Sequence, residues 1–396
     1  MKKVVTLICS LLLIMVACGE PEAQQPEASQ ESSSSVAPQA SASAAVEPAA
    51  EGGGEGSPSG EEASSVEAVL AQVEGMQGSE RRDELIRLAA DSGAVKLYAS
   101  MTPDVGEVLL PAFEEDTGVP VELFRADSDS VRIRLRQEAD AGSIGADVVE
   151  VNGIELALLS QDDLFVPHEP PNIDELIDGV VQPGGWTATR LNIFTVAVNT
   201  NEVAEDERPQ TYQDLADPGW DGRLVMEMDD QIWYKEVYEY LVAEEGLTEE
   251  QADQVFADMA EGAAFVSGHS TMRQLLMAGE YAVASSDYSY GIVQAAAEGA
   301  PVDWQPPVEP LFATPNGIAL IKDATNPAGA VLFYEWWLSD GQEHLPDLAI
   351  DAVRADLQEV GEADLRLVDV ADYVAEAEEW TTRYHNLAGT GEIVPE

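Results

Sequence analysis

The chain has 396 residues, of which 45% are hydrophobic, so it is long enough for two domains with a sizeable core. It carries 75 Asp and Glu residues against 19 Lys and Arg residues, a formal net charge of −56. This charge argues against a nucleic-acid binder and against a binder of anionic membranes, because both functions need a basic surface. We interpret the acidity as adaptation to high salt, which screens repulsion between like charges, rather than as a functional acidic patch.

The N-terminus has the pattern of a secretory signal. A basic start precedes an apolar run over residues 4–17, which is too short to span a bilayer comfortably. The run ends in MVACG, which resembles a bacterial lipobox with Met15 where Leu is usual. We therefore predict a signal peptide over residues 1–17 and lipidation of Cys18; signal cleavage after Cys18 is the alternative. The only other cysteine, Cys9, lies inside the signal, so the mature protein would have no disulfide.

A tether and two short helices are predicted before the globular part. Residues 18–65 are mainly Glu, Pro, Ala, Ser, Gln and Gly with no aromatic residue, so they cannot bury enough apolar surface to fold. This disordered acidic tether would have a mean end-to-end distance of about 35–40 Å. Residues 66–92 favour amphipathic helices that are interrupted between Gly75 and Gly78.

Three strand–helix units follow, which is typical of a parallel sheet with right-handed crossovers. The strands are predicted at residues 95–99, 119–124 and 146–151. A small polar loop follows each strand, and ligands bind at this edge of open α/β sheets. Five side chains in these loops are candidate solute contacts: Ser100, Thr102, Ser128, Ser130 and Asn152. The alternative is that such residues simply cap the helices.

The pattern then changes to one long alternating run over residues 186–199, which suits a strand that crosses between domains. Arg190 on this strand is a candidate partner for an acidic group of a ligand, or else it forms an ion pair. A further strand over residues 224–228 ends at Asp229 and Asp230, which would suit a cationic solute. In so acidic a chain, this carboxylate pair is also explained by chance.

The stretch from residue 265 to residue 304 holds two more candidate features. His269 and Ser270 open a helix, with Ser270 or Thr271 as the expected N-cap, and a helix start offers free N–H groups to an anion. After a strand over residues 281–285, Tyr288 and Tyr290 lie where the strand leads into the next helix. Ligand pockets combine aromatic rings with a few polar groups. The alternatives are an exposed or capping histidine and tyrosines that only pack under a loop.

Several motifs of enzymes are missing from the sequence. There is no phosphate-binding Gly-Lys loop, no zinc-protease helix motif and no nucleophile elbow. The remaining histidines, His168, His344 and His385, show no metal-ligand spacing. We therefore predict no enzyme activity, no catalytic residue and no cofactor.

An ordered series of segments resembles the periplasmic solute-binding components of bacterial ABC importers, in the branch that includes ferric-iron-binding proteins. The series covers about residues 83–345 and includes VKLYASMTPDVGEVLLPAFEEDTGVPVELF, GADVVEVN, PQTYQDLADPGWDGRLVMEMDD, MAGEYAVASSDYSYGIVQAAAEGAPVDW and TPNGIALIKDATNPAGAVLFYEWWLSDGQ. The resemblance implies an α/β fold of the periplasmic-binding-protein type II, in which crossing hinge strands join two mainly parallel sheets flanked by helices. A small solute or ion would lie in the interdomain cleft.

The resemblance also implies a domain organisation and partners. The first domain would comprise residues 93–195 with 306–340, and the second residues 196–305 with 341–396. The expected partners are the solute, the membrane permease of an ABC importer and, through the lipid anchor, the membrane. We expect a monomer at the periplasmic or extracytoplasmic face of the cell envelope, without nucleic acid.

The resemblance leaves the solute open. In ferric-binding members, the turn that is residues 287–291 here carries two adjacent tyrosines as iron ligands. Tyr290 matches one position, but its partner position holds Ser289, and Tyr288 lies one residue earlier. The main interpretation is therefore an organic solute such as a phosphonate, a polyamine or thiamine, and the alternative is iron(III) bound with Tyr290. A structural or partner-binding surface lipoprotein is the alternative from another class.

Overall fold

The computed structural model describes residues 65–358, 360–361, 363–389 and 392–393. The predicted signal peptide, Cys18 and all of the predicted tether except Ser65 lie outside the described residues. The helices are α1 (Val66–Gln72), α2 (Gly78–Ala89), α3 (Pro103–Thr117), α4 (Ser128–Asp140), α5 (Gly153–Ser160), α6 (Gln231–Ala243), α7 (Glu249–Gly262), α8 (His269–Ala278), α9 (Ser289–Ala297), α10 (Pro327–Trp337) and α11 (Val370–Ala388). Short 3₁₀ helices connect some of them, including η5 (Asp340–His344).

The strands form one mixed sheet in the order β14-β8-β7-β9-β6-β11-β3-β1-β2. Their bounds are β1 (Val95–Ala99), β2 (Val121–Arg125), β3 (Val148–Asn152), β6 (Trp186–Asn199), β7 (Leu224–Glu227), β8 (Ala263–Val266), β9 (Val283–Tyr288), β11 (Leu311–Ile321) and β14 (Glu392–Ile393). Shorter strands pair at the sides of β6 and β11: β4 (Phe165–Val166), β5 (Val181–Gln182), β10 (Val302–Asp303), β12 (Asp351–Ala352) and β13 (Leu365–Leu367).

Two groups of parallel strands make up the sheet. We call β1, β2 and β3 the first half, and β7, β8, β9 and β14 the second half. Parallel pairing within each half follows from strand–helix alternation, since a helix between two strands brings the chain back to the same end of the sheet. The predicted α/β fold with two parallel groups is confirmed.

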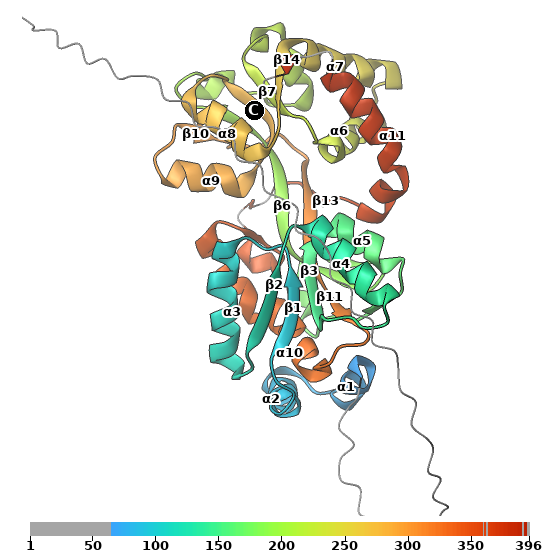
Figure 1. Ribbon diagram of the computed structural model, residues 1–396. Coiled ribbons are helices and arrows are strands. Elements are labelled where there is room, and N and C mark those ends of the chain that lie inside the picture. Colours follow the sequence, from blue (N-terminus) through green and yellow to red (C-terminus); the bar gives the residue numbers. More distant parts are fainter. Residues whose placement is uncertain (1–64, 359, 362, 390–391, 394–396) are drawn as a thin grey trace, which may run out of the picture. The chain divides into compact units, whose positions relative to one another are not determined.

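The antiparallel strands β6 and β11 join the two halves (Figure 1). Phe194 on β6 pairs with Phe312 on β11 and with Tyr288 on β9. Strand β11 begins at Leu311 and continues through Pro315 to Ile321. Pro315 does not end the strand because it lies next to an irregularity in the pairing with β6, where the lack of an N–H is tolerated.

The N-terminal helices pack on α10, an apolar helix that is buried along most of its length. The predicted interruption is real, because α1 ends at Gln72 and α2 begins at Gly78. The Arg81 guanidinium donates to the Glu335 carboxylate, with 2.7 Å between Nη2 and Oε1. Glu335 also lies 2.8 Å from Nε2 of His168, so a buried charged network fixes α2 to α10.

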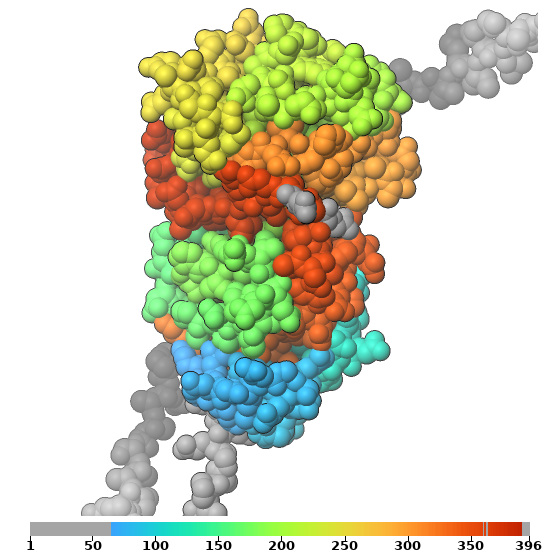
Figure 2. Space-filling view, turned by 180° about the vertical axis from the view of Figure 1, so that it is seen from behind, coloured from blue at the N-terminus to red at the C-terminus, as the bar shows by residue number. Residues whose placement is uncertain are grey.

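The C-terminal helix α11 contacts helices of both halves. It packs against α5, which follows β3, and against α6 and α7, which belong to the second half. Figure 2 shows α11, in red, between green residues of the first half and yellow residues of the second.

The two-domain boundaries stay a prediction. In the segment 341–396, which we assigned to the second domain, β12 pairs with β6 at Leu191 and Arg190, and Leu345 and Ile350 lie in the core around β1 and α10. Across the described ranges, we find no helix with the length and apolarity that a membrane span needs.

Candidate functional site

The strand ends of the first half carry the predicted polar side chains, but local contacts use several of them. Asp127 caps α4, since its carboxylate accepts hydrogen bonds from the N–H and the hydroxyl of Ser130 at 2.9 and 2.6 Å. Ser128 is buried and accepts from the N–H of Asn152 at 3.3 Å. Thr102 and Asn152 precede α3 and α5, are exposed, and make no capping hydrogen bond with their side chains. The capping alternative is therefore wrong for Asn152.

Four residues form what we call the polar cluster: Ser100, Glu150, Arg190 and Asn316. Ser100 directly follows β1, and the other three lie on β3, β6 and β11. The N–H of Ser100, just after β1, donates to the carbonyl of Glu150 on β3 at 2.9 Å. Nε of Arg190 on β6 lies 3.4 Å from Oε1 of Glu150, so Arg190 forms an ion pair within the protein. Asn316 on β11 lies opposite Arg190 in the pairing register, which brings these side chains to one face of the sheet.

The polar cluster is partly buried and incompletely hydrogen-bonded. Glu150 is fully buried, and Asn316 is 1% exposed. The Ser100 hydroxyl and both side-chain polar atoms of Asn316 have no hydrogen-bond partner within the described part of the chain. Burial raises the pKa of Glu150, and the charge of Arg190 opposes that shift. Sequence reasoning missed Glu150 and Asn316, although a carboxylate inside the apolar strand VVEV is an available signal.

The start of the second half holds a carboxylate–histidine group made of Glu227, Asp230 and His269. One ligand atom from each residue lies within 4.8 Å of the others. Nε2 of His269 is 3.1 Å from Oδ1 of Asp230. The Glu227 carboxylate accepts from the N–H groups of Gly268 and Asp229, at 2.7 and 2.5 Å. The carboxylate of Glu227 therefore accepts hydrogen bonds from N–H groups that could otherwise bind an anionic ligand.

Electrostatics in this group favour a protonated histidine. Burial lowers the pKa of His269, but Asp230, with help from Asp287 and Glu227, outweighs it and raises the pKa to about 8. Burial raises the pKa of Glu227, and the charge of Asp230 adds to that shift.

Two predicted residues lie outside the carboxylate–histidine group. Asp229 is exposed, and its carboxylate lies 3.2 Å from Nε2 of His385. Ser270 is exposed in the first turn of α8, whose N-cap is Gly268 rather than Ser270 or Thr271. Gly268 has a φ of 86°, a conformation that favours glycine, and with Gly268 as N-cap the helix begins two residues earlier than it would after a cap by Ser270.

His269, Tyr288 and Tyr290 form an aromatic stack. The rings of His269 and Tyr288 are 4.0 Å apart between centroids, with 21° between their planes. Tyr288 and Tyr290 are 5.8 Å apart and tilted by only 16°, so both rings project to the same side. Ser289 between them is buried and donates its hydroxyl to Asp351 at 2.5 Å. The side chain of Ser289, which holds the position of the second adjacent tyrosine in ferric-binding proteins, thus points away from the stack.

Arg273 on α8 supports the stack from the side. Its guanidinium donates to both oxygens of Asp287, at 2.6 and 3.1 Å, and lies 5.9 Å from the ring centroid of Tyr290. A Cβ on Gly291 would be 2.0 Å from this guanidinium, so only glycine permits the approach.

Charged residues around the aromatic stack, including Arg190 of the polar cluster, shift the pKa values of its tyrosines. Burial raises the pKa of the Tyr290 hydroxyl, while Arg273 and Arg190 lower it. Burial also raises the pKa of Tyr288 well above its ordinary value, and Asp230 and Tyr290 add to that shift. Both hydroxyls are therefore protonated at neutral pH and available as hydrogen-bond donors. The arrangement suits recognition of a polar molecule and contains no nucleophile beside a general base.

Comparisons with known proteins agree with this fold. The profile of the bacterial extracellular solute-binding proteins matches residues 109–344. Iron uptake protein A1 of Synechocystis is 23% identical over 266 residues, which are 62% of this chain and 71% of that protein.

Solved structures with the same fold include three binding proteins. Iron-bound HitA from Pseudomonas aeruginosa has a TM-score of 0.59 at 19% identity and covers 74% of this chain and 99% of its own. FutA from Trichodesmium, with iron and citrate, has a TM-score of 0.60 at 21% identity over 74% and 99% of the two chains. AfuA from Actinobacillus pleuropneumoniae, with fructose-6-phosphate, has a TM-score of 0.60 at 20% identity over 75% and 99%.

These matches confirm the predicted type II periplasmic-binding-protein fold and the predicted role of a solute-binding component of an ABC importer. They also place its function outside the cytoplasm, where it meets small solutes or ions and a permease. The chain belongs to the bacterial extracellular solute-binding proteins.

Proposed function

We propose that the protein captures a small organic solute between the aromatic stack and the polar cluster and presents it to its permease. The observation that carries the proposal is the side-by-side arrangement of Tyr288 and Tyr290, which lie partly buried where β9 leads into α9. Ring faces of this kind contribute much of the binding energy in small-molecule sites, and a few polar groups orient the ligand.

The proposal includes the candidate residues from the sequence. His269, Tyr288 and Tyr290 would contact the solute directly, and Ser100 would contact it from the first half. Thr102, Ser130 and Asn152 lie at the same edge of the first half and remain candidates for its outer contacts. Ser128, Asp229 and Ser270 also stay candidates, although Ser128 is buried and Asp229 lies beside His385.

Attachment to the membrane is the second part of the proposal. Lipidation of Cys18 would hold the protein at the outer face of the membrane, and the segment up to residue 65 would be the tether. The protein would act as a monomer, because one chain contains both halves of the sheet.

Iron(III) is the second candidate solute, and one observation favours it. Glu227, Asp230 and His269 bring potential ligand atoms within 4.8 Å of one another, next to Tyr288. Iron uptake protein A1 and the iron-bound structures of HitA and FutA add support. Against iron, Ser289 stands where the second adjacent phenolate would be, and its hydroxyl donates to Asp351.

A thermal-shift screen of the purified mature protein tests the proposal. A ligand present at about 100 times its dissociation constant adds roughly 2.7 kcal/mol to the free energy of unfolding. We expect stabilisation by an organic solute and no visible tyrosinate-to-iron charge-transfer band with ferric salt. A band that survives dialysis and disappears in Tyr290→Phe would establish iron as the cargo instead.

A further inference from the structure

Asn316 has the most unusual environment among the buried polar side chains of the described residues. It is 1% exposed, and neither its amide nitrogen nor its amide oxygen has a hydrogen-bond partner. Native proteins rarely bury a polar group without a partner, because water is given up and nothing replaces it. The Ser100 hydroxyl is also unpartnered, and the Glu150 carboxylate, which lies 3.4 Å from Arg190 and next to the backbone N–H of Met101, is not fully hydrogen-bonded.

The backbone around Asn316 is irregular at this point. Along β11, Asn316 pairs with Arg190, but the next residue, Gly317, pairs with Ala188, so β6 contributes one extra residue, Thr189. A bulge of this kind redirects side chains and is common beside binding sites. A Cβ on Gly317 would lie 2.5 Å from the ring of Trp186, so glycine is needed to keep the strands close here.

The charges of the polar cluster balance. Glu150 carries one carboxylate and Arg190 one guanidinium, and the two groups are paired. A charged group brought into this buried place would have no countercharge, which is costly. Asn316 offers one donor group and one acceptor, and Ser100 offers both. The group that fits is itself uncharged and both donates and accepts hydrogen bonds.

We propose that Ser100, Glu150, Arg190 and Asn316 form a subsite that hydrogen-bonds an uncharged hydroxyl or carboxamide group of the solute. This inference rests on the proposed function, and it narrows the solute to a neutral polar molecule whose other part lies against the aromatic stack. Strand β6 links the two regions, because it carries Arg190 opposite Asn316 and, four residues further on, Phe194, whose ring lies 5.3 Å from that of Tyr288.

The first test uses the solute-free protein. Asn316→Leu keeps the size of the side chain and removes the two unpartnered atoms, so we expect an unchanged or higher melting temperature. Asn326→Leu is the matched control, because Asn326 is equally buried but donates to the carbonyl of Gly93 at 3.0 Å and accepts from the N–H of Gly329 at 2.9 Å. The control should melt at a clearly lower temperature. A similar fall in Asn316→Leu would mean that ordered water or protein already satisfies Asn316, and would contradict the subsite.

The second test measures binding of defined probes. Glucose, myo-inositol and nicotinamide supply uncharged hydroxyl or carboxamide groups, whereas putrescine, citrate, methylphosphonate and ferric citrate are charged. We expect at least one uncharged probe to raise the melting temperature. Its affinity should fall by about tenfold or more in Asn316→Leu and in Ser100→Ala, the second variant being the milder change.

The outcomes separate this inference from the proposed function. If only a charged probe binds, and Tyr290→Ala weakens it, the solute-binding site stands and the neutral subsite is wrong. An uncharged probe that binds equally well to wild type, Asn316→Leu and Ser100→Ala would also contradict the subsite. If no probe of either kind changes the melting temperature, the inference fails together with its choice of solute class.

Discussion

Tyr288 stacks on His269 with 4.0 Å between the ring centroids, and the same imidazole lies 3.1 Å from the carboxylate of Asp230. The stacking contact joins the end of β9 to the start of α8. Asp230 is the N-cap of α6, so the ion pair connects a third element that is distant along the chain. One wall of the proposed site is thus held by an imidazolium between an aromatic ring and a carboxylate. Its charge state should influence stability.

The first prediction concerns pH. The pKa of His269 is raised from 6.5 to about 8, so the folded state binds this proton more tightly than the unfolded state. The resulting stabilisation is fully present below about pH 6.5 and is lost as pH rises through about 8; a shift of this size corresponds to about 2 kcal/mol. Chemical denaturation at pH 6 and pH 9 should therefore show a larger loss of stability in wild type than in His269→Gln.

His385→Gln is the matched control for this measurement. His385 also pairs with an aspartate, Asp229 at 3.2 Å, but its side chain is 51% exposed. We expect its pH dependence to match that of wild type. Identical pH profiles for wild type and His269→Gln would show that the imidazole of His269 contributes no charge-dependent stability.

The second prediction concerns the attachment of α2 to α10. Burial raises the pKa of Glu335, but His168 and Arg81 outweigh it and hold the pKa below its ordinary value. Glu335→Gln leaves the buried guanidinium of Arg81 without its carboxylate. Breaking a buried ion pair from one side costs about 3–5 kcal/mol, so the denaturation midpoint should fall strongly.

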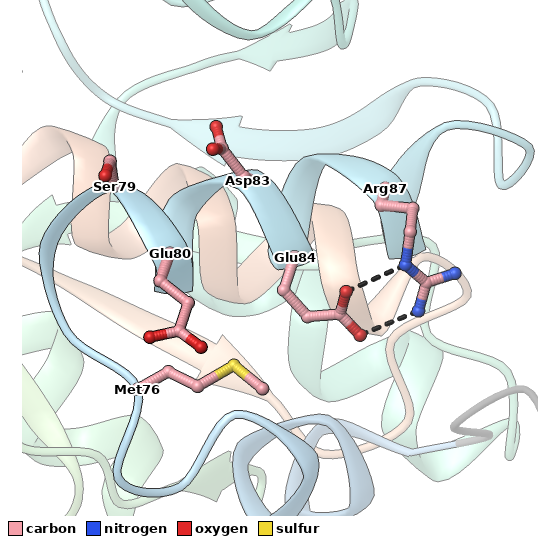
Figure 3. A pocket seen from close by; sticks show the side chains of 6 residues that line it. All are labelled: Met76, Ser79, Glu80, Asp83, Glu84 and Arg87. Carbon is pink, nitrogen blue, oxygen red and sulfur yellow. Dashed lines mark hydrogen bonds and ion pairs between the residues drawn. The ribbon is translucent and has the colours of Figure 1, made fainter.

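A second acidic residue on the same pair of helices provides the comparison. Glu84 lies on the outer face of α2 and pairs with Arg87 at 2.7 Å, beside Glu80 and Asp83 (Figure 3). This pair is exposed to solvent, and exposed pairs contribute little. Glu84→Gln should leave the midpoint almost unchanged. Equal effects of the two substitutions would contradict the assignment of Glu335 as the anchor.

The third prediction concerns membrane attachment. Cys18→Ala should abolish labelling with a fatty-acid probe and release the protein into the soluble fraction without detergent. Cys9→Ala is the control, because the predicted signal peptide carries Cys9 away. Membrane association of Cys18→Ala at the level of wild type would disprove the lipid anchor.

The fold was predictable because strand–helix alternation and the long run over residues 186–199 leave few topologies. The polar loops after β1, β2 and β3 were placed correctly at one edge for the same reason. The sequence did not reveal which of two neighbouring carboxylates turns inward. Asp230 precedes α6 as its N-cap and meets His269, while Asp229 points to solvent, and that choice depends on where the helix begins.

The polar cluster was not predictable, since three of its four side chains meet through strand pairing far apart in the sequence. Glu150 lies inside an apolar strand, and Asn316 follows a proline, a residue that is uncommon inside strands. Only the register of β11 against β3 and β6, with its irregularity at Asn316, brings them together. For Ser289, the sequence shows its position between two tyrosines, but the hydrogen bond from its hydroxyl to Asp351 could not be predicted from the sequence.

Titration calorimetry of wild type and Tyr290→Ala, with the solute that the thermal-shift screen identifies, tests the central claim most directly. Tyr290 belongs to the aromatic stack, and the positive charge of Arg190 in the polar cluster lowers the pKa of its hydroxyl. Loss of its ring and hydroxyl should weaken binding by about 1–3 kcal/mol, roughly 5- to 150-fold in the dissociation constant. An unchanged dissociation constant in Tyr290→Ala would contradict the placement of the solute against the aromatic stack.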